Sequence, residues 1–146
     1  MSIPPIDYLE SISHMIVKDW AEQLSHSNSL YSTRPMPELE ATTRECLDAY
    51  LSAIKEENYE LLNDFIDSIA SFRSSMSFSE HEVVDAFRAF RKIASDYLLA
   101  GLVSDDVDID PLSDVIDAIC QVVDYTIMRF SEIYYTARAN QVQKEA

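Results

Sequence analysis

Aspartates are concentrated in residues 104–114, SDDVDIDPLSD, and alternating carboxylates are the side chains that calcium-binding loops use as ligands. If Asp106 is the first position of such a loop, carboxylates fall at the third, fifth, ninth and twelfth positions, namely Asp108, Asp110, Asp114 and Asp117. However, Pro111 occupies the sixth position, where the sharp turn needs glycine, and the twelfth residue is an aspartate instead of the longer glutamate. A helix start explains the same residues, with Asp110 as N-cap, Pro111 as first helical residue and Asp114 near the positive end of the helix dipole. We therefore predict a helix start and no metal site.

The three histidines are the next residues that could do chemistry. His14 with Lys18 resembles the H-x-x-K-G motif of histidine phosphotransfer proteins, but the lysine comes one residue late and the glycine is absent. His81 with Glu82 resembles the phosphoacceptor helix of histidine kinases, without the basic residue, threonine and proline that usually follow. An axial haem ligand needs an apolar pocket, whereas His81 lies between glutamates and His26 among serines. We interpret all three as surface residues and predict no cofactor.

Catalytic motifs are missing from the rest of the chain. No serine lies in a G-x-S-x-G turn, and a chain with one glycine cannot form a glycine-rich phosphate loop. Paired carboxylates such as Glu56 and Glu57 fall on expected solvated turns. Cys46 and Cys120 have no metal-like spacing and are expected to be free thiols. The sequence therefore predicts a protein that is not an enzyme.

Charge and hydropathy narrow the choice of partners. The net charge of −15 disfavours nucleic acid and anionic membrane surfaces, because both would be repelled. No apolar run approaches the roughly 20 residues of a membrane span, and the N-terminus lacks the basic and apolar regions of a secretory signal. We expect a cytoplasmic protein.

Aromatic residues on predicted apolar helix faces form the remaining candidate site. They either pack the core or line a pocket between helices for a small apolar ligand, a common place for such sites. The candidate pocket residues are Trp20, Phe65, Phe87, Phe90, Tyr97 and Phe130.

The elements that position these residues are predicted to be helices. A single glycine in 146 residues favours helices over strands, whose turns depend on glycine. Apolar residues recur at helical spacing in five segments: 6–25, 37–55, 56–72, 77–99 and 112–140. The second and third segments are separated by a break near residues 55–58.

The ends of two of these helices have specific signals. The fourth begins with two overlapping capping boxes, Ser77…Glu80 and Ser79…Glu82, and Gly101 is placed to act as its C-cap. The fifth carries a heptad seam that indicates a long helix: Leu112, Ile116, Ile119, Val123, Thr126, Phe130, Ile133 and Ala137. We predict one all-α domain over residues 1–146, a bundle of about five helices in which residues 135–146 form a linker helix to an output domain.

The order of elements resembles the N-terminal domain of RsbR/RsbRD-type regulators, which also precedes some bacterial histidine kinases. The resemblance rests on Trp20 in IVKDWAEQL, on Arg73 and on the block from Phe78 to Arg91. It implies a non-enzymatic signal-input domain followed by a STAS or kinase output domain, and a fold that is globin-like without haem.

Together these features predict a cytoplasmic sensory module of a stress-response or two-component regulator. Its signal would pass through the last helix to an output domain or partner regulatory protein, and that helix could also pair two copies. Two alternatives stay open: a histidine phosphotransfer protein that uses His14 or His81, and a helical bundle that binds a small ligand.

Overall fold

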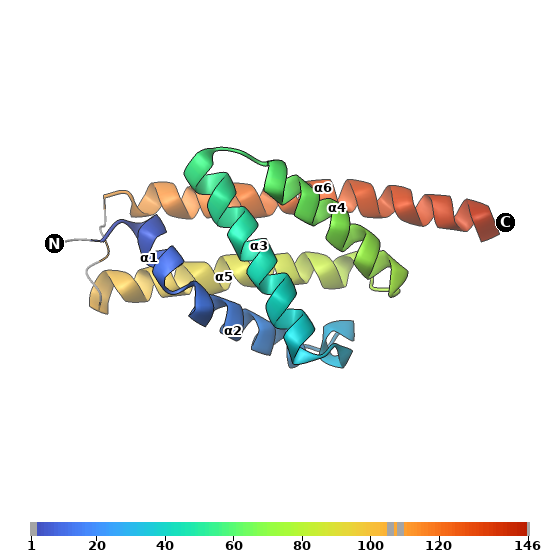
Figure 1. Cartoon of the computed structure of the whole chain (residues 1–146), viewed down its shortest axis with the longest axis horizontal. Coiled ribbons are helices and arrows are strands. Elements are labelled where there is room, and N and C mark those ends of the chain that lie inside the picture. The colour runs from blue at the N-terminus through green and yellow to red at the C-terminus, as the bar shows by residue number, and fades with distance from the viewer. Residues whose placement is uncertain (1–2, 105–106, 108–109, 146) are drawn as a thin grey trace.

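The computed structural model describes residues 3–104, 107 and 110–145, without the side chains of 137, 138 and 140–145. Helices make up nearly all of this part of the chain, with no strand and one isolated bridge between Ile3 and Val107. The elements are α1 (Pro5–Ser11), α2 (Ser13–Ser25), the 3₁₀ helix η1 (Leu30–Thr33), α3 (Met36–Glu56), α4 (Glu60–Ser75), α5 (Glu80–Ser104) and α6 (Leu112–Glu145) (Figure 1). The predicted all-α, single-domain class is confirmed.

The bundle is built around its two long helices. α5 and α6 run in opposite directions along the long axis of the molecule, and α3 crosses them at a steep angle (Figure 1). α4 packs against α6, and α2 packs against α3 and α5. α6 contacts α1, α3, α4 and α5, so it touches most of the other helices.

The predicted first helix is two helices, which raises the number of α-helices from the expected five to six. The break lies at Ile12, whose φ of −106° and ψ of 16° leave the helical range. Ser11 next to it donates its hydroxyl to the carbonyl of Tyr8 at 2.7 Å, a local bond that competes with the helical backbone. The bend lets Leu9 on α1 and Ile16 on α2 both reach the core.

The predicted break between the second and third segments is confirmed, since α3 ends at Glu56 and α4 begins at Glu60. α5 begins with one of its two predicted capping boxes. The Ser79 amide donates to Glu82 Oε1 at 2.9 Å, and the Glu82 amide donates to Ser79 Oγ at 3.1 Å. Ser77 instead lies in the preceding turn with a φ of 64°, so the Ser77…Glu80 box does not form.

Gly101 is not a C-cap, because α5 continues to Ser104 and Gly101 is buried inside it. A Cβ at this position would lie 2.6 Å from Tyr8 Cε2 and 2.8 Å from Val107 Cγ2. The residue is therefore required for close packing of α1 against α5, a tertiary demand that no local signal announces.

α6 begins at Leu112, where the predicted apolar segment starts, so Pro111 directly precedes the helix instead of being its first residue. The Pro111 carbonyl accepts the first helical bond from Val115 at 3.1 Å. Asp106 and Asp108 lie outside the described residues. The seam residues from Leu112 to Ile133 are buried or half-buried, and the side chain of Ala137 is not described. Tyr134 is the last buried residue described on α6, whose ribbon continues past the ends of α4 and α5 (Figure 1).

Candidate functional site

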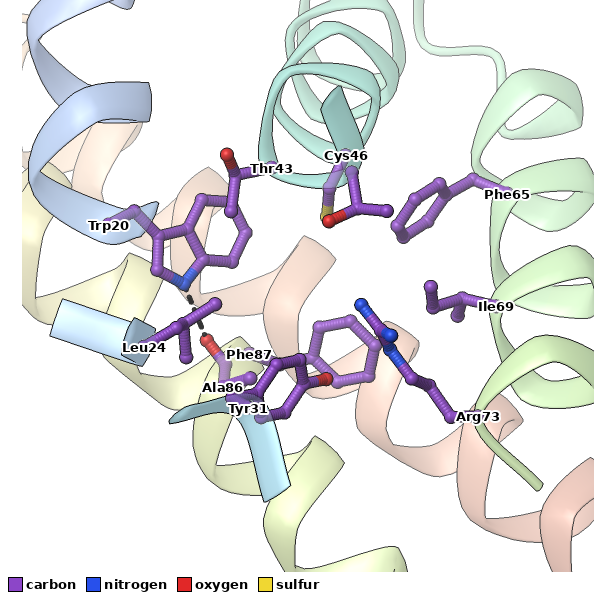
Figure 2. Close-up of a pocket in the computed structure, with 11 residues that line it drawn as sticks. Trp20, Leu24, Tyr31, Thr43, Cys46, Phe65, Ile69, Arg73, Ala86 and Phe87 are labelled. Atoms are coloured by element: carbon purple, nitrogen blue, oxygen red, sulfur yellow. Dashed lines mark hydrogen bonds between the residues drawn. The ribbon is translucent and has the colours of Figure 1, made fainter. Parts of the chain in front are cut away.

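A small cavity lies in the core where α2, η1, α3, α4 and α5 meet, and we call it the Arg73 cavity (Figure 2). Its volume is about 20 Å³, which is room for about one water molecule. The residues that line it are mostly apolar: Trp20, Leu24, Tyr31, Thr42, Thr43, Cys46, Phe65, Ile69, Arg73, Ala86 and Phe87.

Trp20 is fixed at one side of the cavity by a bond between distant elements. Its indole N–H, on α2, donates to the carbonyl of Ala86, on α5, at 3.0 Å (Figure 2). The bond satisfies the one polar atom of a side chain that is almost completely buried. The ring also packs against Phe90, with 5.2 Å between the centroids.

Arg73 is the charged residue of the cavity, and only 1% of its side chain is exposed. It follows Leu62, Ile66 and Ile69 at helical spacing, so it lies on the apolar face of α4. Figure 2 shows its head reaching from α4 into the space beside Tyr31 and Phe87. Its Nη1 donates to Glu38 Oε2 at 3.2 Å, whereas its buried Nε has no hydrogen-bond partner.

Aromatic rings surround the Arg73 guanidinium. Its central carbon lies 4.9 Å from the ring centroids of Tyr31, Phe72 and Phe78. Cation–π contacts of this kind partly replace the water that burial removed. Burial raises the pKa of Tyr31 to about 12 although the Arg73 charge opposes the shift, so Tyr31 stays neutral at physiological pH.

Glu38 supplies the carboxylate for Arg73 and shares it with a second arginine. Arg34 donates Nη2 to Glu38 Oε1 at 2.6 Å and Nε to Oε2 at 2.8 Å. These bonds from Arg34, with a smaller contribution from Arg73, hold the pKa of Glu38 below its usual range. Two guanidinium groups thus face one carboxylate, which leaves an excess of positive charge beside the cavity.

A polar groove of about 250 Å³ adjoins the Arg73 cavity, and we call it the vestibule. Leu24, Tyr31 and Ala86 line both spaces, so these residues form the wall between them. The remaining vestibule residues are mainly polar: Gln23, Ser27, Asn28, Ser29, His81, Glu82, Asp85 and Ala89.

Glu82 holds η1 in place over the cavity. Besides capping α5, its Oε2 accepts the backbone N–H of Leu30 at 2.6 Å. Burial raises the pKa of Glu82, but the bonds from the Leu30 and Ser79 backbone outweigh it, so the net shift is downward. A carboxylate at residue 82 therefore positions Tyr31, which follows Leu30 in η1.

The structure separates the six predicted pocket aromatics into three groups. Trp20, Phe65 and Phe87 line the Arg73 cavity. Phe90 lies behind Trp20, and Phe130 lies behind Phe87 with 5.6 Å between ring centroids. Tyr97 lies elsewhere, where its hydroxyl donates to Asp19 in a separate surface hollow. The prediction of a ligand pocket stays a prediction, and Tyr97 does not belong to this cavity.

The structure also shows how exposed the histidines and cysteines are. All three histidines are exposed, and His81 Nε2 lies 3.0 Å from Asp85 Oδ2. Burial raises the pKa of the Cys46 thiol, and Cys120 is half-buried; both are free. In the described part of the chain, no three histidine, cysteine or acidic side chains are grouped closely enough to hold a metal ion. None of the helices described there combines the length and apolar character needed to cross a membrane.

Sequence reasoning did not identify the burial of Arg73 or the roles of Glu38 and Tyr31. The available signal was the helical spacing that places Arg73 after Leu62, Ile66 and Ile69 on an apolar face. Nothing comparable marks Tyr31, since it lies in a connection without hydrophobic periodicity.

Comparison with known proteins identifies a family. The family described as RsbT co-antagonist protein rsbRD N-terminal domain matches residues 14–146. No curated protein and no solved structure matches the chain. The match covers the Arg73 cavity, the vestibule and α6, and it confirms the family resemblance expected from the sequence. The chain belongs to the family of RsbT co-antagonist protein rsbRD N-terminal domains.

Proposed function

We propose that the chain is a non-enzymatic, cytoplasmic signal-input module of a bacterial stress-response regulator. A change in the core around the Arg73 cavity alters the packing of α6, and α6 carries the change to an output domain or partner protein. Family membership supports the signalling role. The finer steps are supported by the way in which the cavity is connected to α6.

The observation that carries this proposal is a series of ring contacts from the cavity to α6. Phe87, on the cavity wall, contacts Phe130 of α6 edge to face, with 5.6 Å between the centroids. Phe130 contacts Tyr134 at 5.2 Å, one turn further along α6. Because cores are close-packed, a displaced Phe87 cannot leave Phe130 unaffected.

The end of this series lies where α6 leaves the bundle. Tyr134 and Tyr135 line a surface groove together with Ser77, Ser79 and Glu80, from the α4–α5 turn and the start of α5. The same turn contains Phe78, whose ring packs on Arg73. Two routes, through Phe87 and through Phe78, thus connect the cavity with the exit of α6.

The family description and the exposed end of α6 support the choice of partners. We propose that α6 acts on an output domain or on a partner regulator of the kind named in the family description, RsbT, and that two copies can pair through this helix. The globin-like arrangement implied by the resemblance is part of this proposal. We also propose that the module has no catalytic activity; burial raises the pKa of the Cys46 thiol in the cavity, so this thiol is not an activated nucleophile.

Insertions into α6 test whether the helix transmits the signal. The insertions are made after Thr136 in the complete gene. Two inserted residues turn the helix beyond them by about 200°, whereas seven inserted residues turn it by only about 20°. We expect the two-residue insertion to change the output of a stress-response reporter and the seven-residue insertion to preserve it. Equal reporter output from both insertions and the wild type would refute transmission through α6.

Binding of a partner is a separate measurement. Titration calorimetry of the purified protein against the RsbT-type regulator of the same genome should show saturable binding, and Tyr135→Ala should weaken it because 74% of Tyr135 is exposed at the exit of α6. Met15→Ala is the matched control, since Met15 is also an exposed apolar residue but lies on α2. An absence of binding, together with an unchanged reporter after deletion of the gene, would reject the proposed function.

A further inference from the structure

We propose that the Arg73 cavity and the vestibule together bind a small organic acid with one carboxylate and a hydroxyl or ammonium substituent, and that Arg73 Nε receives the carboxylate. This inference rests on the proposed function only in treating the acid as the signal that the module receives. Binding itself does not depend on any partner and can be measured alone.

Arg73 has one buried hydrogen-bond donor, Nε, that is unused. A guanidinium has five N–H groups in a fixed plane, and its usual partners are carboxylates and phosphates. Nη1 of Arg73 is occupied by Glu38 and by the sulfur of Met76, whereas Nε is buried without a partner and belongs to a side chain that lines the cavity. A buried donor is unfavourable until an acceptor reaches it, so the site is prepared for an oxygen atom.

The charges of Arg34, Arg73 and Glu38 also favour an anionic ligand. Both oxygens of Glu38 are already engaged by Arg34, so Glu38 neutralises only part of the charge on the two arginines. The result is a local excess of positive charge, from the buried Arg73 and the partly exposed Arg34, inside a chain whose net charge is −15. An anionic group at Nε would balance it, and a neutral ligand would not.

Size and lining define the rest of the ligand. The Arg73 cavity, at about 20 Å³, has room for one carboxylate oxygen and little more, so the remainder of the molecule must occupy the vestibule of about 250 Å³. Tyr31 stands on the wall that both spaces share and must turn aside for a ligand to fill them together. Tyr31 belongs to the four-residue η1, which the Glu82 carboxylate holds through Leu30, so opening the wall requires η1 to shift and the Tyr31 ring to leave Arg73 and Phe78.

The polar residues of the vestibule favour a ligand that donates hydrogen bonds. The carboxylates of Glu82 and Asp85 line it, so they attract a hydroxyl or ammonium group and repel a second carboxylate. Gln23 and Asn28 add amide groups that can donate or accept. A hydroxy acid or an amino acid of a few carbon atoms has this combination, and a dicarboxylate does not.

Trp20 reports on this site directly, because it is the only tryptophan in the chain and its ring lines the cavity. Fluorescence of the wild-type protein should be titrated with sodium L-lactate and L-alanine as probes, with sodium succinate and sodium chloride at matched ionic strength for comparison. We expect a saturable change with lactate or alanine, a response to succinate that is at least about tenfold weaker, and none with chloride. The two probes distinguish a hydroxy acid from an amino acid.

Two variants separate the role of Arg73 from general effects of charge. Arg73→Met should abolish the saturable change, whereas Arg44→Met, which removes an arginine that donates to Ser13 and does not line the cavity, should retain it. Circular dichroism establishes that each variant is folded. If Arg73→Met does not fold, the ¹⁵N-edited NMR signal of the Arg73 Nε–H in the wild type gives the answer, because a bound carboxylate must shift it.

The proposal is overturned if the folded wild type shows no saturable response to either probe, if Arg73→Met binds equally well, or if the Nε–H signal stays unchanged at saturating probe. Each of these results would leave a buried water as the occupant of the cavity. None of them would affect the proposed function, which the α6 insertions and the partner titration test without any ligand.

Discussion

Replacing Glu38 with glutamine should destabilise the fold much more than replacing Arg73, which it binds. Glu38→Gln leaves the Arg73 guanidinium, 1% exposed, without a carboxylate. Breaking a buried ion pair by removing one partner typically costs about 3–5 kcal/mol. Because 19% of the Glu38 side chain is exposed and glutamine still accepts a neutral hydrogen bond, we reduce the expected loss of unfolding free energy to roughly 2–3 kcal/mol. For a domain of this length, the corresponding decrease in Tm is about 4–12 °C.

Arg73→Met should behave differently, because it removes the charge together with the cost of burying it. Methionine fills similar space with an apolar chain, and Glu38 keeps its two bonds to Arg34. We expect the unfolding free energy to change by less than about 1 kcal/mol. In the Arg73→Met background, Glu38→Gln should also cost less than about 1 kcal/mol, so the coupling free energy between the two positions is about 2 kcal/mol.

Urea unfolding of the four proteins, followed by circular dichroism, measures this coupling. A pH series adds a sign test. The folded-state pKa of Glu38 is lowered, so its contribution to stability is present above its unfolded-state pKa and is lost as the pH falls through its folded-state pKa. The advantage of the wild type over Glu38→Gln should therefore shrink on acidification. An equal cost of Glu38→Gln with and without Arg73 would show that the buried charge does not control stability here.

Three further outcomes are expected. Gly101→Ala places a methyl group 2.6 Å from the Tyr8 ring, and the overpacking cost of about 1–3 kcal/mol should exceed the helix-propensity gain of at most about 1 kcal/mol, so thermal unfolding should show a lower Tm. Because the folded-state pKa of Glu82 is lowered, its hydrogen bond to the Leu30 amide of η1 is fully present above the unfolded-state pKa and is lost as the pH falls through the folded-state pKa. The protection of the η1 amides relative to their intrinsic exchange rates should therefore fall on acidification, and Glu82→Gln should show low protection at neutral pH as well; unchanged protection in the variant would contradict this role. Cys120, half-buried, should react with a thiol reagent in the native protein while Cys46 reacts only after unfolding, and equal labelling rates would contradict the burial assigned to Cys46.

Helical periodicity predicted most of the fold because the helices bury one face each. The seam of α6 and the break between α3 and α4 follow from residue spacing, and the Ser79–Glu82 capping box follows from two residue types three positions apart. The break at Ile12 and the role of Gly101 could not be predicted in the same way. The break depends on which serine bonds its own backbone, and the role of Gly101 depends on how α1 packs against α5, a contact that joins residues far apart in the sequence.

The site was only partly predictable for a related reason. Trp20, Phe65 and Phe87 were expected to point inward because aromatic residues on an apolar face usually do. The same face of α4 includes Arg73, but residue type argues for exposure, and a buried arginine is stable only if a partner is buried with it. That partner, Glu38, lies 35 residues earlier on α3, and no local pattern connects the two positions.

Stability alone gives no reason to have a guanidinium at residue 73, since an apolar side chain of similar size would cost little or nothing there. A binding role gives one, and it makes a prediction that a structural role does not. In Glu38→Gln the charge of Arg73 is uncompensated, so a carboxylate ligand should bind this variant more tightly than the wild type. At a ligand concentration a hundred times the Kd of the variant, the variant is stabilised by about 2.7 kcal/mol, and the wild type, with its larger Kd, is stabilised by less. Sodium L-lactate or L-alanine, whichever gives the fluorescence response, should raise the Tm of Glu38→Gln further than that of the wild type, and it should leave Arg73→Met unchanged. A ligand that stabilised the wild type and Glu38→Gln equally would bind without using the charge of Arg73, and the carboxylate would have to lie elsewhere.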